Sequence, residues 1–521
     1  MLVPPKKLVA FGAAVLAARQ RHASRRTGVA SRQQEGTRRQ LLRELSRTAF
    51  GRHYGLSPHL TYPEWQQRVP PRRYENFLPF IERMRRGESG VLWPGACQLF
   101  ASTAGTCGTV KQLPVTPALL DHFHRACFQT LLHYHGRVAQ SGVFRGRHLV
   151  LDGWPVPTAA FADDPAAAPV CRILARHLPA WVEKHYYESV HGTVAPTDAE
   201  AGAVSGSPLS EVCAVAGLPS SLLRWAQTAP EPGDRGDAPP TLQLRWPQLE
   251  CVFHGGLPLG PYVEQLRQAA GPGVTFHEVF AATEAFIATQ EAESAAGLRL
   301  LTDAGVFFEF IPLPDFEAGR LDALGPKALP IGAIKANTDY VLVLTTPGGL
   351  CRYVLGDIVR FVSVDPPRLV YVGRTALQLN AFGEAVQEKD VTEALTTVCQ
   401  RHNWRIVNFH VAPYFAAQPG RATRGCHEWW IELKPGTVET PTGPVIVQEL
   451  DRELRRTCAR YETRRAQGIV DAPVARLVMP GVFEEWMQAT SRGGAQHKVP
   501  RCRSDRVVAE DLCRLAPYSA H

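Results

Sequence analysis

Residues 100–116 read FASTAGTCGTVKQLPVT, and this stretch decides which fold the chain can have. Small residues and hydroxyl groups run up to Lys111, and Pro114 and Thr116 follow it. Glycine lets main-chain N–H groups approach a ligand closely, and a loop of such groups cradles an anion. A lysine adds a compact positive charge that suits phosphate. The stretch therefore predicts a nucleotide phosphate loop, although a plain turn rich in Gly and Thr has the same composition.

The stretch differs from the P-loop of mononucleotide-binding NTPases. That motif places a Gly-Lys pair directly before Ser or Thr. Here Val110 precedes Lys111, and Gln112 follows it. Because a bland loop and a phosphate loop share this composition, the rest of the chain has to separate them.

The composition is that of an ordinary soluble globular protein, with 45% apolar and 20% charged residues. A chain of 521 residues has room for roughly two to four domains. The formal net charge of +8 is modest for this length. We interpret the N-terminal arginines as a solvated helix face rather than a site for nucleic acid or membrane. They are Arg19, Arg21, Arg25, Arg26, Arg32, Arg38 and Arg39.

The twelve cysteines are scattered singly along the chain. They form no CxxC pair and no Cys/His spacing typical of a zinc site. This pattern indicates reduced thiols rather than a disulfide framework, so we expect a cytoplasmic protein.

An apolar run, LVAFGAAVLAA at residues 8–18, follows Lys6 and Lys7. Its shape is that of a short signal-peptide core. It is too short to span a bilayer, which takes about 20 apolar residues. We favour a first helix that packs on the core over a targeting segment, and no other stretch could span a membrane.

Helix and strand patterns set the fold class. Residues 1–60 predict two helices, the second near Arg38 to Phe50, and residues 117–136 predict another. From Leu249 onward, strands alternate with helices, which argues for an α/β fold with a largely parallel sheet. The predicted strands are residues 250–256, 275–280, 305–312, 340–345 and 368–372.

A compact α+β unit is predicted after Arg374. Its strands are residues 404–412, 427–433 and 475–479, and its helices are residues 390–401 and 449–461. We place the boundary near Gln378 to Asn380. The chain is therefore expected to have a large α/β domain at 1–378 and a smaller α+β domain at 379–521.

Four charged residues could complete a nucleotide site with the opening stretch. Glu284 follows a strand end and could hold Mg²⁺ against phosphate oxygens, while the nearby Phe280 ring could stack on a purine. Asp357 suits the hydroxyls of a ribose, and Arg374 is a donor for ribose or phosphate. Lys498 lies in the Gly-rich run GGAQHKVPR. Each alone has an ordinary explanation as a cap, a turn residue or a surface charge, and only their order along the chain is specific.

That order resembles the acyl-adenylate-forming superfamily and, within it, the Gretchen Hagen 3 family of acyl-acid amido synthetases. The resemblance covers nearly the whole chain and is closer to prokaryotic members than to plant ones. The blocks that carry it are TAFGRHYGL, VLWPG, WPQLECVFHGG, GVFFEFIPL, TTPGGLCRYVLGDIVRF, VGRTALQLNAFGEAV, ARYETRR and GGAQHKVPRC. It implies an N-terminal adenylate-forming domain with mixed sheets and a mobile C-terminal domain.

The resemblance also implies site residues. The ATP-binding positions of the phosphate loop are Thr103, Gly105, Thr106, Gly108 and Lys111. The positions that hold adenine are Gly255, Gly256, Phe280 and Ala281. Thr283 and Glu284 occupy a Ser/Thr-Glu step, with Glu284 as the carboxylate associated with Mg²⁺. Asp357 takes the ribose place, Arg374 the Gly-Arg place near the hinge, and Lys498 the place of the mobile-domain lysine that helps adenylation.

The sequence departs from the family pattern at four positions. Phe280 stands where Tyr is usual, and Ala285 where Gly is common. Cys107 replaces a hydroxyl residue in the phosphate loop, and a thiol is a weak donor. Cys351 replaces a frequent Tyr. None of these changes removes a charged group.

The implied function is ATP-dependent ligation. A carboxylic acid would be adenylated to acyl-AMP, and the acyl group would pass to an amine, such as an amino acid, to form an amide. Lys498, Glu284 and Lys111 would be catalytic, with ATP and Mg²⁺ as cofactors and small molecules as partners. Two alternatives stay open: a thiol acceptor such as coenzyme A or a carrier protein, and a nucleotide-binding protein without catalysis. We expect no nucleic-acid partner and no membrane span.

Overall fold

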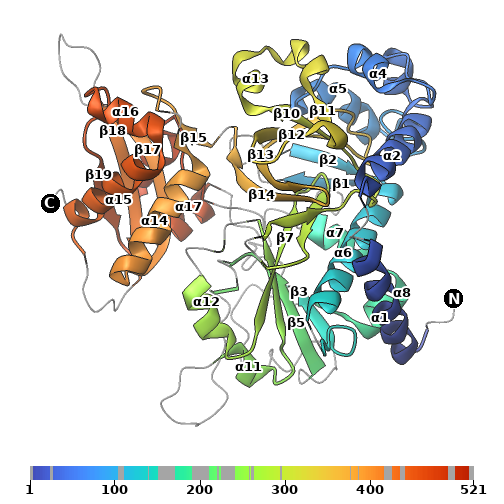
Figure 1. Cartoon of the computed structure of the whole chain (residues 1–521), viewed down its shortest axis with the longest axis horizontal. Coiled ribbons are helices and arrows are strands. Elements are labelled where there is room, and N and C mark those ends of the chain that lie inside the picture. The colour runs from blue at the N-terminus through green and yellow to red at the C-terminus, as the bar shows by residue number, and fades with distance from the viewer. Residues whose placement is uncertain are drawn as a thin grey trace. The chain divides into compact units, whose positions relative to one another are not determined.

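The computed structural model describes residues 4–23, 27–103, 111–138, 140–150, 170–189, 211–219, 222–223, 241–256, 259, 263–293, 296–375, 377–384, 386–415, 425–434, 441–490 and 499–515. The chain forms two compact units, which divide between Tyr371 and Val372 (Figure 1). Strand β14 (Pro367–Arg374) runs across this division, so the division does not fix the position of a hinge. The boundary at Gln378 to Asn380 stays a prediction.

The first unit opens with helices. They are α1 (Lys6–Ala23), α2 (Val29–Leu45), α3 (Ala49–His53), α4 (Tyr62–Arg68) and α5 (Tyr74–Arg85). The sequence placed the second helix too late, near Arg38 to Phe50. The pattern of apolar residues missed the first part of α2 because the buried face there is partly polar. The Gln34 amide, on that face, donates to the carbonyls of Thr302 and Val306.

The opening stretch of sequence forms a β-hairpin followed by a helix. Strand β1 (Leu99–Thr103) pairs antiparallel with β2 (Lys111–Val115), and Thr103 lies opposite Lys111. Thr116 then caps α6 (Pro117–Arg137), since its hydroxyl accepts a hydrogen bond from the Leu119 N–H at 3.1 Å. The Gly/Thr-rich loop of residues 104–110, between the two strands, lies outside the described residues.

A large sheet forms the centre of the first unit. Among the described residues it has twelve strands in the order β11-β10-β12-β13-β14-β9-β8-β7-β6-β5-β3-β4. Those not yet given are β3 (Arg147–Val150), β4 (Tyr187–Ser189), β5 (Val212–Gly217), β6 (Cys251–Gly255), β7 (Thr275–Ala281), β8 (Phe286–Gln290), β9 (Leu298–Leu300), β10 (Phe307–Pro312), β11 (Leu329–Pro330), β12 (Asp339–Thr345) and β13 (Tyr353–Val364). The helices beside them are α7 (Val170–Arg176), α8 (Ala180–His185), α11 (Leu242–Arg245), α12 (Val263–Ala270) and α13 (Leu313–Ala318), with short 3₁₀ turns at Leu321–Ala323, Gly325–Lys327 and Ile331–Ala333.

The sheet is mixed, so the expectation of a largely parallel sheet was wrong. The strands from β4 to β7 pair in parallel. The pairs β7–β8, β8–β9, β9–β14, β12–β13, β10–β12 and β10–β11 are antiparallel. Short links such as Ala282–Ala285, between β7 and β8, favour hairpins, because a parallel connection needs a longer crossover. The mixed sheet is what the family resemblance implied.

The second unit is a compact α+β fold, as predicted. Strands β17 (Ile406–Phe415) and β18 (Gly425–Leu433) are antiparallel, and β19 (Val474–Val478) joins β18 in parallel. The remaining elements are β15 (Gln378–Leu379), β16 (Val386–Gln387), α14 (Glu388–His402), α15 (Gly443–Thr457), α16 (Ala459–Ala466), α17 (Val482–Ala489) and α18 (Val507–Leu515). The single helix predicted at 449–461 is two helices, because Cys458 between them has extended backbone.

No helix within the described ranges is both long enough and apolar enough to cross a membrane.

Candidate functional site

Lys111 is the first residue of β2 and directly follows the Gly/Thr-rich residues 104–110. Its ammonium group donates a hydrogen bond to the Tyr353 hydroxyl at 3.4 Å. The ammonium nitrogen also lies 5.5 Å from the centre of the Tyr74 ring and 6.0 Å from that of Tyr353. Aromatic faces attract a cation at such distances. The lysine is therefore positioned by Tyr74 of α5 and Tyr353 of β13.

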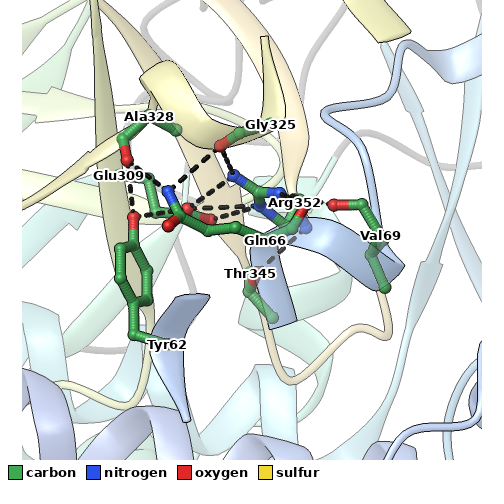
Figure 2. Close-up of polar contacts among 8 residues, drawn as sticks. All are labelled: Tyr62, Gln66, Val69, Glu309, Gly325, Ala328, Thr345 and Arg352. Carbon is green, nitrogen blue, oxygen red and sulfur yellow. Dashed lines mark hydrogen bonds and ion pairs between the residues drawn. The ribbon is translucent and has the colours of Figure 1, made fainter. Parts of the chain in front are cut away.

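Arg352, the residue directly before Tyr353, forms a buried ion pair with Glu309 (Figure 2). The Arg352 guanidinium contacts the Glu309 carboxylate at 2.9 Å, and both side chains have no exposed surface. The remaining N–H groups of Arg352 donate to carbonyl oxygens of Gln66, Val69 and Gly325. Arginine has five N–H donors, and all five find acceptors here. A buried charge is tolerated when it is paired and fully hydrogen-bonded in this way.

The surroundings of this pair fix the start of β13. The Tyr62 hydroxyl lies 2.8 Å from both Glu309 Oε1 and the Ala328 carbonyl oxygen, and burial raises the pKa of Tyr62. The Arg352 backbone has a φ of +54°, which is uncommon for a residue other than glycine. Its N–H donates to the Thr345 hydroxyl at 2.9 Å. This strained, heavily bonded residue therefore sets the direction in which Tyr353 leaves the turn.

Asp357 lies on the same strand at an irregularity in the sheet. The register between β12 and β13 shifts between Val341 and Val343, opposite the segment that contains Gly356 and Asp357. Gly356 has a φ of +86°, which only glycine adopts at little cost. Asp357 is buried, with 1% of its surface exposed. The sequence pointed to this Gly-Asp pair without predicting that it lies within a long strand.

The residues predicted to hold adenine lie at the ends of two neighbouring parallel strands. Gly255 of β6 is the register partner of Val279 of β7. A side chain on Gly255 would meet the Val279 carbonyl oxygen at 2.4 Å, so the position requires glycine. Gly256 has a φ of +75°, and Ala281 is exposed. The structure thus brings the double glycine beside the end of β7.

Phe280 differs from a simple stacking platform. Its ring is 8% exposed and packs edge to face on Tyr371, with ring centres 5.7 Å apart. The ring therefore belongs to a hydrophobic core cluster of the first unit. Its role against adenine stays a prediction.

The turn that carries Thr283 and Glu284 is anchored by a histidine. The Ala282 N–H donates to the Ala285 carbonyl at 2.9 Å, which closes the turn between β7 and β8. The Phe286 N–H, directly after the turn, donates to His122 Nε2 at 2.9 Å. His122 Nδ1 in turn lies 2.8 Å from the Ala304 carbonyl. Burial lowers the pKa of His122 to about 4, so the ring is neutral at pH 7 and can accept at Nε2 while it donates at Nδ1.

Glu284 fits a magnesium ligand by its chemistry. The residue is buried, with 8% of its surface exposed. Among the described residues, no group of three or more His, Cys, Asp or Glu side chains could hold a metal ion. Mg²⁺ at phosphate sites commonly takes only one or two protein carboxylates and completes its shell with phosphate oxygens and water. A single carboxylate in a fixed turn is consistent with that mode of binding.

The second unit fixes the segment that follows Lys498. His410 Nδ1 donates to the Pro500 carbonyl at 2.6 Å, and burial lowers the pKa of His410 to about 4. The Val411 N–H donates to the Arg501 carbonyl at 2.9 Å. Residues 499–503 are thus tied to β17, while Lys498 lies outside the described residues, as do Gly105, Thr106, Cys107 and Gly108. Arg374 ends β14, where it bridges to Leu377.

Three domain models of one family match the chain in order. The N-terminal domain of the GH3 family matches residues 20–155, its central domain residues 299–374, and its C-terminal domain residues 389–507. Together they span more than half of the chain. The chain belongs to the GH3 family.

Plant GH3 proteins are among its relatives. The chain is 29% identical over 237 residues to a probable indole-3-acetic acid-amido synthetase, GH3.6 of Oryza sativa subsp. japonica, which covers 42% of this chain and 46% of the relative. It is 28% identical over 256 residues to the jasmonoyl-L-amino acid synthetase JAR4 of Nicotiana attenuata, with 46% and 42% covered. The chain spans about half the length of the relatives it matches. These matches confirm the family that the sequence motifs indicated.

A solved GH3 structure shares the fold. The chain matches AtGH3.15 acyl acid amido synthetase in complex with 2,4-DB with a TM-score of 0.72 over 94% of both chains, at 17% sequence identity. At that identity the likeness concerns the fold alone. It confirms the predicted architecture, a large mixed α/β part followed by a smaller α+β part.

The sequence motifs predict part of the candidate site, namely Lys111, Asp357 and the turn at Glu284. They do not predict the residues that hold these in place. Tyr353 and Arg352 lie in the block TTPGGLCRYVLGDIVRF. An arginine within such an apolar run was the signal that could have indicated a buried ion pair. His122 gave no signal, because a single histidine in an amphipathic helix looks like any half-buried residue.

Proposed function

We propose that this GH3 protein is an ATP-dependent ligase that adenylates a carboxylic acid and then joins the acyl group to an amine, such as an amino acid. The observation that carries the proposal is the position of Lys111 at the start of β2, near the rings of Tyr74 and Tyr353. Two similar proteins are named a probable indole-3-acetic acid-amido synthetase and a jasmonoyl-L-amino acid synthetase. Their names support an amide product without identifying the substrates of this chain.

The first half-reaction would activate the acid. A carboxylate oxygen attacks the α-phosphorus of ATP, the bond to the bridging oxygen breaks, and pyrophosphate leaves with that electron pair. Lys111, Thr103 and the loop of residues 104–110 would bind the pyrophosphate end and stabilise its growing charge. Mg²⁺ bound at Glu284 would supply further charge neutralisation. Thr283 would help to hold the phosphates from the same turn.

The other residues would bind the nucleoside. Gly255 and Gly256 would face the edge of adenine, with Phe280 and Ala281 at its face. Asp357 would accept hydrogen bonds from the ribose hydroxyls, and Arg374 would donate to ribose or phosphate. Lys498 would stabilise charge between the carboxylate and the α-phosphate.

The second half-reaction would form the amide. The amine nitrogen attacks the acyl carbon, AMP leaves with the electron pair of the acyl–oxygen bond, and the nitrogen loses a proton. We infer that the second unit rotates between the two steps about a hinge near Gln378 to Asn380. We place the enzyme in the cytoplasm, which is supported by the free thiols of the eleven cysteines that the structure describes.

Acid-dependent exchange between ATP and pyrophosphate tests the first step. A panel of carboxylic acids should contain at least one that raises exchange well above the rate without acid. Mass spectrometry of the products with mixed amino acids should then detect an amide. A thioester with coenzyme A in place of the amide would favour a thiol acceptor. ATP binding without exchange for any acid would favour a protein that binds nucleotide without catalysis.

A further inference from the structure

Helix α1 turns an apolar face outward. Leu8 is 65% exposed, Phe11 71%, Val15 46% and Leu16 42%. Single apolar residues on a surface are ordinary, but several on one helix face indicate a site of interaction.

The helix cannot bury that face by turning over, because its inner face is already fixed. Ala13 and Ala17 are buried and pack in a core cluster with Leu132 and Tyr134 of α6. The small alanine side chains allow the two helices to lie close together. At the far end of α1, the Gln20 amide nitrogen lies 2.7 Å from His133 Nε2. The helix therefore belongs to the folded unit, and its apolar outer face is a fixed surface feature.

Basic residues border the apolar face. At 100° per residue, Phe11, Val15 and Leu8 fall within an arc of about 60° on the helix surface. Lys7 lies next to this arc on one side and Arg19 on the other, and both are exposed. The helix contains no acidic residue. A purely apolar partner would explain the centre of this face but not its positive borders.

We propose that the outer face of α1 docks on an anionic membrane surface. Phe11, Val15 and Leu8 enter the boundary between lipid headgroups and acyl chains, as do the apolar residues of helices that lie in a membrane interface. Lys7 and Arg19 reach the headgroup phosphates with their long side chains, so for Arg19 this proposal replaces the solvated face expected from the sequence. The helix lies on the bilayer rather than across it, because Ala13 and Ala17 hold its opposite face in the core beside α6. Docking brings the whole first unit to the membrane surface, since α1 is packed onto α6.

Vesicle flotation with the full-length chain tests this proposal. The chain should float with vesicles that contain phosphatidylserine and should bind phosphatidylcholine vesicles more weakly. The double variant Leu8→Ser/Phe11→Ser should lower the partition coefficient by at least about tenfold, because two large side chains lose their transfer into the lipid. Arg19→Glu should lower binding to phosphatidylserine vesicles by roughly tenfold and leave the weak phosphatidylcholine binding unchanged.

Leu244→Ser is the matched control. Leu244 on α11 is 56% exposed and belongs to another surface, so this variant should float like the wild type. Equal flotation of the Leu8→Ser/Phe11→Ser variant and the wild type would overturn the proposal. So would a wild-type chain that binds neither kind of vesicle. A dimer that ignores vesicles and becomes monomeric on the double substitution would assign the face to a second copy instead.

Discussion

At the scale of single residues, the hydroxyl of Tyr353 has a role that can be separated from its ring. The ring faces Lys111, and the hydroxyl accepts a hydrogen bond from the same ammonium group. Tyr353→Phe removes this hydrogen bond and keeps the ring. We expect the KM for ATP in pyrophosphate exchange to rise about fivefold, since such a bond contributes about 1 kcal/mol. Tyr353→Leu, which also removes the ring, should raise it further.

Tyr340→Phe is a suitable control for this comparison. The Tyr340 hydroxyl accepts a hydrogen bond from the Lys335 N–H at 2.9 Å, on the neighbouring strand β12. The variant therefore loses a similar bond away from Lys111, and its KM for ATP should stay at the wild-type value. An equal rise in KM for the two Phe variants would contradict a specific role of Tyr353.

The buried Arg352–Glu309 pair makes a prediction about stability. Arg352→Met leaves the Glu309 carboxylate buried without its partner, which should lower the free energy of unfolding by about 3–5 kcal/mol. Arg360→Met, on the strand β13 that follows Arg352, breaks the half-exposed pair with Asp339 and should cost at most about 1 kcal/mol. Urea unfolding of both variants measures the difference. Similar losses would mean that burial of the pair at Arg352 has no special weight.

At the scale of elements, His122 connects helix α6 to the turn between β7 and β8. It does so only as a neutral ring, because Nε2 must accept from the Phe286 N–H. The folded state therefore disfavours protonation, and burial lowers the pKa of His122 from 6.5 to about 4. The unfolded chain takes up the proton near pH 6.5. The contribution of neutral His122 to the free energy of unfolding is therefore fully present above pH 6.5 and is lost as the pH falls toward 4.

This coupling predicts a pH dependence of unfolding. Between pH 6.5 and 4, His122 should contribute a loss of up to about 1.4 kcal/mol per pH unit. His122→Gln keeps a donor and an acceptor without a titrating ring, so its free energy of unfolding should fall less steeply than that of the wild type. His59→Gln, the same substitution at an exposed histidine, serves as the control. A His122→Gln slope equal to that of the wild type would contradict the assignment.

Sequence patterns predicted the elements that are apolar and short. The strands β6, β7, β10, β12 and β14 were found because continuous apolar runs end in turn residues. Strand β13 was not expected as a strand, since Gly356 and Asp357 interrupt its pattern where the sheet is irregular. The start of α2 was missed because Gln34 and Arg38 are buried through hydrogen bonds rather than through apolar contact.

The candidate site was predictable only where the chain itself carries a pattern. Glycines that need positive φ, such as Gly256 after β6 and Gly356 at the irregularity within β13, mark backbone features that can be read locally. The residues that support Lys111 and the turn between β7 and β8 are far away in sequence: His122 lies 164 positions from Phe286, and Lys111 lies 242 from Tyr353. No local pattern encodes such pairs. The fold has to form before they are visible.

At the scale of the whole molecule, the proposed function divides the catalytic residues between two units. Lys498 belongs to the second, where residues 499–503 are tied to β17. We expect Lys498→Ala to suppress acid-dependent exchange by about two orders of magnitude or more, since one well-placed charge in a transition state contributes that much. ATP affinity, measured by calorimetry, should change little.

Lys389→Ala provides the comparison for Lys498→Ala. Lys389 lies on α14 of the same unit, in a surface ion pair with Glu393, and such pairs contribute little. The variant should exchange at the wild-type rate. Near-normal exchange by Lys498→Ala would remove that lysine from the adenylation step.

The pair of Arg352 and Glu309 also bears on how the protein is made on the ribosome. Arg352 donates to the carbonyl of Gln66 in α4, which is 286 positions earlier in the chain. At about 5–20 residues per second, the ribosome takes roughly 15–60 s to supply that partner. During this interval α4 and its neighbours are without the guanidinium group that satisfies their carbonyls. We therefore expect the segment around α4 to reach its native packing only after translation has passed the start of β13.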